Sequence, residues 1–220
     1  GKAPVIAGCG SNATKQAIHL TCQAQNAGAD AALHVVPYYN KPSQEGLYQH
    51  YKVLAETGKK IIIYNVPSRT GQNIEASTTL KLANEFPNLF MIKEAAPNIL
   101  QYFDILRQKP ANFSLVSGDD EYTLPVTLAG GDGVISVIGQ AYPKEFSTMV
   151  QLGFEGKVKD AYKIHNKLVE ITRLIFAEGN PSGIKTILAE MGIIKNYLRL
   201  PLVAASAGLQ DKIKAQMAKI

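Results

Sequence analysis

The sequence of 220 residues contains no long apolar run. No stretch of about 18 or more apolar residues occurs, so no transmembrane helix is expected. The first residues do not combine a basic segment with an apolar one, so no signal peptide is expected either. We therefore predict a soluble, cytoplasmic protein of ordinary globular composition.

Cysteine is also scarce, with only Cys9 and Cys22 in the chain. They form neither a C-x-x-C motif nor a Cys/His ligand spacing, and the four histidines are far apart in the sequence. These patterns do not favour a metal site, a disulfide or a histidine-based catalytic triad. Free thiols are typical of a cytosolic protein.

The net charge of +5 does not come from a basic run with interleaved aromatic residues. Nucleic acid is therefore not an expected partner. No glycine-rich loop matches a phosphate-binding or dinucleotide-binding fingerprint, so neither a nucleotide nor another cofactor is expected. A mild positive field suits small anionic substrates, although a lysine-rich solvated surface is the more common source of such a charge.

Six short apolar runs are present, and their starts are separated by 20 to 29 residues. They occupy residues 4–8, 32–36, 61–64, 90–93, 113–116 and 133–138. Helical patterns lie between them, led by Asn12, by Ser43 and by Glu75. Strands that alternate with helices indicate a parallel sheet, either a (β/α) barrel or a doubly wound sheet.

After the sixth run the pattern becomes helical, at residues 156–176, 181–191 and 207–219. We predict two parts: residues 1–142 as barrel units, and residues 143–220 as a last barrel helix followed by a helical domain. The appended helices offer a surface for self-association. In parallel α/β folds the chemistry lies at the carboxyl ends of the strands, so the loops after the strands are the place to look.

Lys93 ends an apolar strand, and there it is a candidate nucleophile. A lysine amine attacks a carbonyl only when it is neutral, and desolvation favours that form. The alternative is a structural lysine that reaches to solvent and pairs with Glu94. Buried charges are rare and cluster at functional sites, so both readings stay open at this point.

Residues 63–71, at the end of the strand before the Lys93 strand, place a phenol, an arginine and a hydroxyl close together. Arg69 can bind a carboxylate with two parallel hydrogen bonds, and Tyr64 can exchange a proton. A tyrosine packed over a proline turn beside a surface arginine is the structural alternative. Tyr38 and Tyr39, between two prolines, predict either a site wall or aromatic packing beneath the next helix.

Several motifs together resemble the dihydrodipicolinate synthase family in order and spacing. The most specific are YNVPSRTG at residues 64–71, IKEA at 92–95, SGDD at 117–120 and GVISV at 133–137. The likeness extends over nearly the whole chain through PVIAG at 4–8, PYYNKPS at 37–43 and NPSGIK at 180–185. The joint match is far more specific than any single motif.

The resemblance implies a (β/α)8 barrel with a C-terminal helical domain, commonly a homotetramer built as a dimer of dimers. It implies a lyase in which a lysine forms an imine with pyruvate. The enamine then attacks L-aspartate 4-semialdehyde, and cyclisation gives 4-hydroxy-tetrahydrodipicolinate on the route to diaminopimelate and lysine.

Carried over by position, each candidate residue takes a role that the resemblance implies. Lys93 resembles the imine lysine, Tyr64 the proton relay, and Arg69 the carboxylate binder. Tyr39 resembles the tyrosine that completes a neighbour's relay across a dimer interface. The backbones of Gly118 and Ile135 resemble the floor around pyruvate. Residues that match the family's lysine-inhibition site are Asn12, Gln16 and Tyr38. Because Gln16 stands where lysine-sensitive members often have glutamate, feedback inhibition is not a firm expectation.

Two alternative functions remain: another lyase that forms an imine with pyruvate, and a protein without catalytic activity. N-acetylneuraminate lyases and 2-keto-3-deoxy sugar-acid aldolases share the lysine and tyrosine but generally lack the arginine, so Arg69 favours the synthase. A non-catalytic barrel used for binding or assembly is the other alternative. The family also has two βα units before residue 4, with a Gly-Thr-Thr-Gly-Glu type motif, and we find only six of eight units in this sequence. We therefore expect weak activity or none from this chain alone.

Overall fold

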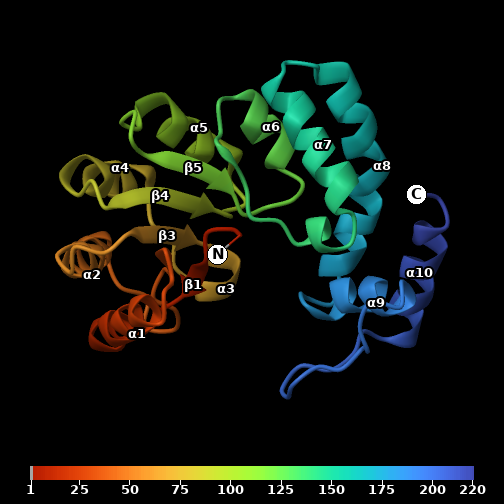
Figure 1. The fold of residues 1–220 in the computed structure, drawn as a ribbon, viewed down its shortest axis with the longest axis horizontal. Coiled ribbons are helices and arrows are strands. Elements are labelled where there is room, and N and C mark those ends of the chain that lie inside the picture. Colours follow the sequence, from red (N-terminus) through yellow and green to blue (C-terminus); the bar gives the residue numbers. More distant parts are fainter. Residues whose placement is uncertain (1) are drawn as a thin grey trace. The chain divides into compact units, whose positions relative to one another are not determined.

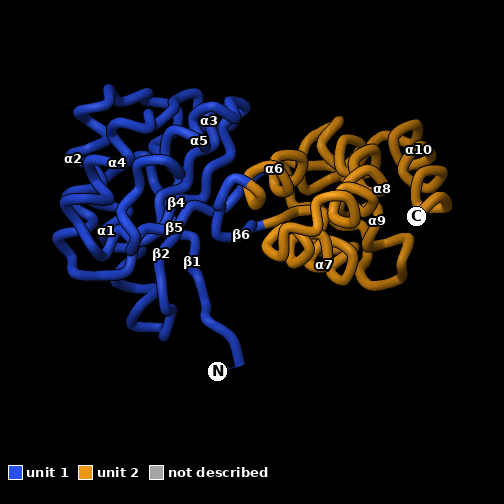
Figure 2. The backbone as a smooth tube through the Cα atoms, turned by 90° about the horizontal axis from the view of Figure 1, so that it is seen from above, with its two compact units in different colours: residues 1–119, 129–135 blue, residues 120–128, 136–220 orange. Residues whose placement is uncertain are grey.

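The computed structural model describes residues 2–220. The chain forms two compact units, shown in blue and orange in Figure 2. The first comprises the residues up to 119 together with 129–135, and the second comprises 120–128 and 136–220. The predicted division after residue 142 stays a prediction.

The first unit contains a six-stranded parallel sheet in which sequence order and spatial order coincide. Its strands are β1 (Ile6–Gly8), β2 (Ala31–Val35), β3 (Ile61–Asn65), β4 (Leu89–Glu94), β5 (Ser114–Ser117) and β6 (Gly133–Val134). The runs rich in isoleucine and valine fit a pleated, buried surface, which explains why they become strands. The prediction of a parallel α/β fold is thereby confirmed for six strands.

Helices cover one face of this sheet, as Figure 1 shows. They are α1 (Thr14–Asn26), α2 (Gln44–Ala55), α4 (Ala76–Glu85) and α5 (Ile99–Gln108), with a single turn, α3 (Pro67–Thr70), after β3. On the covered face His34, Ile63 and Ile92 are fully buried, whereas Tyr64 and Lys93 on the other face are half-buried. The half-buried face carries the polar groups of the candidate site.

Helix starts depend on local capping groups. The Ser43 hydroxyl accepts a hydrogen bond from the backbone N–H of Gly46 at 3.2 Å, so the predicted start of α2 is confirmed. The predicted role of Asn12 at the start of α1 is wrong. Its side-chain amide instead donates to the Tyr38 carbonyl at 3.2 Å, and the helix begins after Ala13 without a side-chain cap.

The sixth predicted strand is too long. Only two of its residues are in β6, and a 3-10 helix, η1 (Ile138–Gln140), follows. The carboxylate of Asp120 accepts the backbone N–H groups of Val137 and Ile138 at 3.1 and 2.9 Å. These bonds turn the chain, although the apolar sequence suits a strand.

The second unit is helical, with α6 (Thr123–Leu128), α7 (Pro143–Phe154), α8 (Val158–Phe176), α9 (Ser182–Glu190) and α10 (Ala207–Met217). Its core includes Ile171, Ile175 and Ile213, which expose no surface. Gly183 lies against the backbone of Ile175, where no Cβ fits, so α8 and α9 approach closely. Among the described residues, no helix is both long and apolar enough to cross a membrane.

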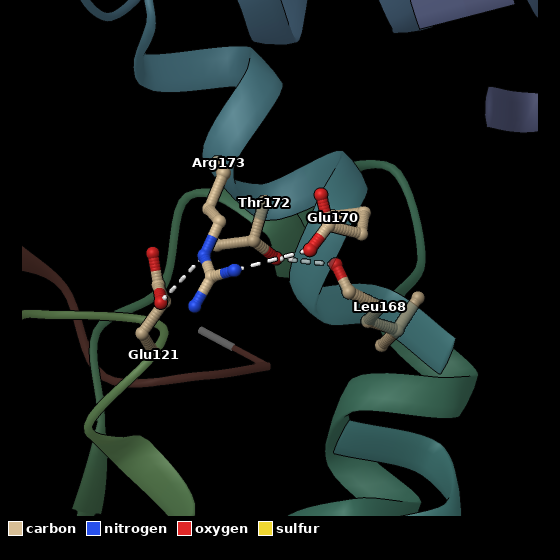
Figure 3. Close-up of polar contacts among 5 residues, drawn as sticks. All are labelled: Glu121, Leu168, Glu170, Thr172 and Arg173. Carbon is tan, nitrogen blue, oxygen red and sulfur yellow. Dashed lines mark hydrogen bonds and ion pairs between the residues drawn. The ribbon is translucent and has the colours of Figure 1, made fainter. Parts of the chain in front are cut away.

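An ion-pair group joins α8 to the segment before α6 within this unit (Figure 3). Arg173 Nε lies 3.1 Å from Glu121 Oε2, and its Nη1 lies 3.0 Å from Glu170 Oε1. The neighbouring Thr172 hydroxyl donates to the Leu168 carbonyl at 2.9 Å inside the helix. Because the arginine is exposed, these pairs contribute little to stability.

Candidate active site

The parallel register brings Lys93 beside Tyr64. Tyr64 on β3 pairs with Lys93 on β4, and both side chains point to the half-buried face of the sheet. The Lys93 Nζ lies 4.2 Å from the centroid of the Tyr64 ring. A cation at this distance is attracted by the ring, and an amine there stands next to a phenol that can exchange a proton.

Burial shapes the acid–base behaviour of the phenol. Desolvation raises the pKa of Tyr64, and the positive charge of Arg69 opposes that rise. The phenol therefore stays protonated at neutral pH and can donate a proton. Arg69 itself is exposed in the turn α3, where its backbone N–H donates to the Val66 carbonyl at 2.9 Å.

Gly118 closes one side of the lysine. Its backbone N–H donates to the Glu94 carbonyl at 2.6 Å, which holds the loop after β5 against the end of β4. A Cβ at this position would lie 2.9 Å from Lys93 Cε and 2.9 Å from Ala95 Cβ. The absence of a side chain at position 118 therefore leaves room for the aliphatic stem of Lys93. Ile135, half-buried after β6, donates its backbone N–H to the Ser117 carbonyl at 2.9 Å.

The loop between β2 and α2 carries the two adjacent tyrosines. Tyr39 exposes 88% of its surface and has a φ of 72°, a strained conformation for a residue with a side chain. Its backbone N–H donates to the Thr70 carbonyl at 3.3 Å, so this loop contacts the turn that bears Arg69. Tyr38 exposes 42% of its surface.

Two of the three residues of the predicted effector site are in contact. The side-chain amide of Asn12 donates to the Tyr38 carbonyl at 3.2 Å. In return, the Asn40 side chain donates to the Asn12 carbonyl at 3.0 Å. Gln16 lies exposed on α1, about one helical turn after Asn12. Within the described part of the chain, no hydrogen bond joins it to Asn12 or Tyr38.

A buried polar cluster on the opposite face of the sheet was not predicted from the sequence. Glu94 exposes no surface, and its carboxylate accepts hydrogen bonds from Asn65, Gln101 and the backbone of Ala96. The alternation of side chains along β4 points Glu94 away from the face that bears Lys93. That alternation is a sequence signal for the position of Glu94, but its partners come from distant segments.

Comparison with known proteins identifies relatives of this chain. All 220 residues match the dihydrodipicolinate synthetase family. The 4-hydroxy-tetrahydrodipicolinate synthase of Phocaeicola vulgatus is 49% identical over 216 residues, which cover 98% of this chain and 73% of that protein. The chain belongs to the dihydrodipicolinate synthetase family.

Solved structures of this family share the fold. The crystal structure of dihydrodipicolinate synthase from Thermotoga maritima superposes with a TM-score of 0.97 at 41% identity, covering 100% of this chain and 76% of that one. A monomeric dihydrodipicolinate synthase variant matches with a TM-score of 0.97 at 40% identity, covering 100% and 74%. The expectation of a lyase of the dihydrodipicolinate synthetase family, drawn from the motifs, is confirmed.

Proposed function

We propose that the chain condenses pyruvate with L-aspartate 4-semialdehyde through an imine on Lys93, giving 4-hydroxy-tetrahydrodipicolinate. The observation that carries the proposal is the pairing of Lys93 with Tyr64 at the carboxyl ends of adjacent parallel strands, with Nζ 4.2 Å from the ring centroid. An amine so placed next to a protonated phenol suits imine chemistry. The eight-unit barrel of the whole family belongs to the same proposal.

The chemistry assigns Lys93 the covalent role. Its neutral amine adds to the C2 carbonyl of pyruvate, and the adduct loses water to form an imine. Loss of a proton from the methyl carbon gives an enamine, which forms a carbon–carbon bond to the aldehyde of the second substrate. The amine of that substrate then attacks the imine carbon, closes the ring and releases the lysine.

Tyr64 serves as the proton relay in this scheme. Its raised pKa keeps the phenol protonated, so it can donate to the hydroxyl that leaves as water. Arg69, in the turn directly after the Tyr64 strand, binds the carboxylate of the second substrate, because a guanidinium can make two parallel bonds to it. Backbone groups of Gly118 and Ile135 line the pyruvate side.

Tyr39 belongs to a contact between two copies of the chain. A strained, 88% exposed tyrosine next to the Arg69 turn suits a side chain that reaches into a neighbour's site. We assign the same interface, with a dimer of dimers as the assembly, to the surface near Asn12, Gln16 and Tyr38. An effector bound there would contact side chains that already bridge the two loops.

A substrate comparison with a matched variant tests the proposal. The protein is incubated with pyruvate and either aspartate semialdehyde or N-acetylmannosamine, and the products are measured by mass spectrometry. We expect product only with the semialdehyde. Arg69→Lys keeps the positive charge but loses the two parallel N–H donors of the guanidinium. In this variant the KM for the semialdehyde should rise about tenfold. Turnover of the sugar but not of the semialdehyde would replace the synthase by a sugar-acid lyase.

A further inference from the structure

A buried carboxylate lies directly behind the lysine and the tyrosine. The register pairs Asn65 with Glu94, one residue beyond the pair of Tyr64 and Lys93. Side chains alternate along a strand, so Asn65 and Glu94 share the helix-covered face. Neither residue exposes any surface. A buried ionisable group costs free energy unless donors surround it, which makes its partners informative.

Both oxygens of the Glu94 carboxylate are satisfied by donors. Oε1 accepts from the backbone N–H of Ala96 at 2.7 Å and from Asn65 Nδ2 at 2.9 Å. Oε2 accepts from Asn65 Nδ2 at 3.1 Å and from Gln101 Nε2 at 2.9 Å. Burial raises the pKa of Glu94, and the hydrogen bonds from Asn65, Ala96 and Gln101 oppose the rise. An ionised carboxylate, which only accepts, fits this set of donors.

The same cluster also holds the end of the loop that bears Arg69. Asn73 Oδ1 accepts from Asn65 Nδ2 at 2.7 Å, and Asn73 Nδ2 donates to Gln101 Oε1 at 2.9 Å. The backbone of Ile74 is bound at both of its polar groups. Its N–H donates to Asn65 Oδ1 at 3.2 Å, and its carbonyl accepts from Gln101 Nε2 at 3.1 Å.

The loop of residues 66–74 is therefore held at both ends by Asn65 and Gln101, the two side chains that donate to the buried carboxylate. It leaves β3 at Asn65, passes through the turn with Arg69 and returns to Asn73, and both asparagines bond to each other. Apolar side chains of similar volume could fill the same space without the cost of burying a charge. They could not specify where the loop returns, because apolar contacts have no direction.

We infer that Glu94 is a positioning residue for the site: through Asn65, Asn73 and Gln101 it holds the Tyr64 strand end and the Arg69 loop in fixed register with Lys93. The inference rests on the proposed imine chemistry of Lys93. Glu94 touches no substrate in this scheme and acts only through its partners. Loosening the cluster lowers the fraction of molecules whose site is assembled, and the apparent affinity for pyruvate falls by that fraction.

The test uses two variants and one control on the full chain. Asn73→Ala removes the side-chain bonds of the loop to Asn65 and Gln101 and leaves all donors of the carboxylate in place. Glu94→Gln keeps the shape of the side chain but replaces one acceptor oxygen by an NH2 group, which then faces other donors. The control Thr21→Val removes a fully buried hydroxyl away from the cluster, which bonds to the Ala17 carbonyl and to His34 on β2, at 2.8 and 3.0 Å.

Three quantities are measured for each protein: the melting temperature, amide hydrogen exchange in residues 66–74, and the pyruvate concentration that gives half-maximal borohydride trapping. We expect Asn73→Ala to speed exchange in the loop and to raise the half-saturating pyruvate concentration by about three- to tenfold, the equivalent of one side-chain hydrogen bond. Glu94→Gln should do the same or more. Thr21→Val should lower the melting temperature without changing either the loop or the pyruvate dependence.

The outcomes separate the inference from the proposed function. If the parent chain traps pyruvate, and Asn73→Ala loosens the loop yet keeps the parent's pyruvate dependence, the cluster is structural and the inference is wrong. An unchanged loop in Asn73→Ala would also overturn it. If the parent chain traps no pyruvate on Lys93, the proposed function fails, and the inference falls with it. Should Glu94→Gln not fold, Asn73→Ala still decides.

Discussion

Replacing Gly118 by alanine should disable the lysine while leaving most of the fold intact. The added Cβ would lie 2.9 Å from Lys93 Cε, 3.0 Å from Lys93 Cγ and 2.9 Å from Ala95 Cβ. The lysine stem can swing away, but the alanine methyl cannot, so the loop or the strand end must also shift. Overpacking of this kind costs about 1–3 kcal/mol of stability. A displacement of the amine by about 1 Å should slow imine formation by up to about a hundredfold.

The assay for Gly118→Ala is the rate of borohydride-trapped adduct at saturating pyruvate, together with urea unfolding. The matched control is Gly8→Ala in the same sheet, because a Cβ at Gly8 meets nothing within 4 Å. We expect slow trapping in Gly118→Ala and normal trapping in Gly8→Ala. Trapping at the parent rate in Gly118→Ala would refute the reasoning, since the lysine would then tolerate the contact.

Three further predictions concern stability. Burial lowers the pKa of His34 and of His50 from 6.5 to about 4. The folded state therefore favours neutral imidazoles, and protons bind more readily to the unfolded chain. The free energy of unfolding should fall by about 3 kcal/mol per histidine as the pH drops from 6.5 to 4. Urea titrations at several pH values check this, and a His34→Gln variant should lose less stability on acidification. Ser43→Ala removes the cap of α2 and should cost about 1 kcal/mol in the same titrations. Arg173→Gln removes exposed ion pairs to Glu121 and Glu170, and should change the free energy of unfolding by less than about 1 kcal/mol; a larger loss would show that the pairs act as a network.

Much of the fold follows from local patterns. Strands such as β3 are buried β-branched runs that begin after a glycine turn, and α2 begins at a capping serine, so both can be read from neighbouring residues. The extent of β6 could not be predicted in this way. The apolar run continues to Ile138, but Asp120, 18 residues away, captures the amides that a strand would use. At this position a hydrogen bond to a distant residue overrides the local preference for a strand.

The site was partly predictable for a similar reason. Lys93 and Tyr64 both lie next to the ends of consecutive parallel strands, so topology predicts that they meet, and the 4.2 Å contact agrees with it. The burial of Glu94 was not predicted. Its donor Gln101 lies on a helix, and Asn73, which bonds to Gln101, lies in a loop, and no short motif encodes the return of either segment to β4. The contact of the Tyr39 backbone with the Thr70 turn likewise joins segments that lie far apart in the sequence.

The most direct test of the central claim is peptide mapping after borohydride treatment of the chain with pyruvate, with Lys93→Ala as control. The account predicts one stable adduct, located on Lys93 and missing from the control. Adducts that persist in Lys93→Ala, or an unmodified Lys93 in the parent chain at saturating pyruvate, would contradict it.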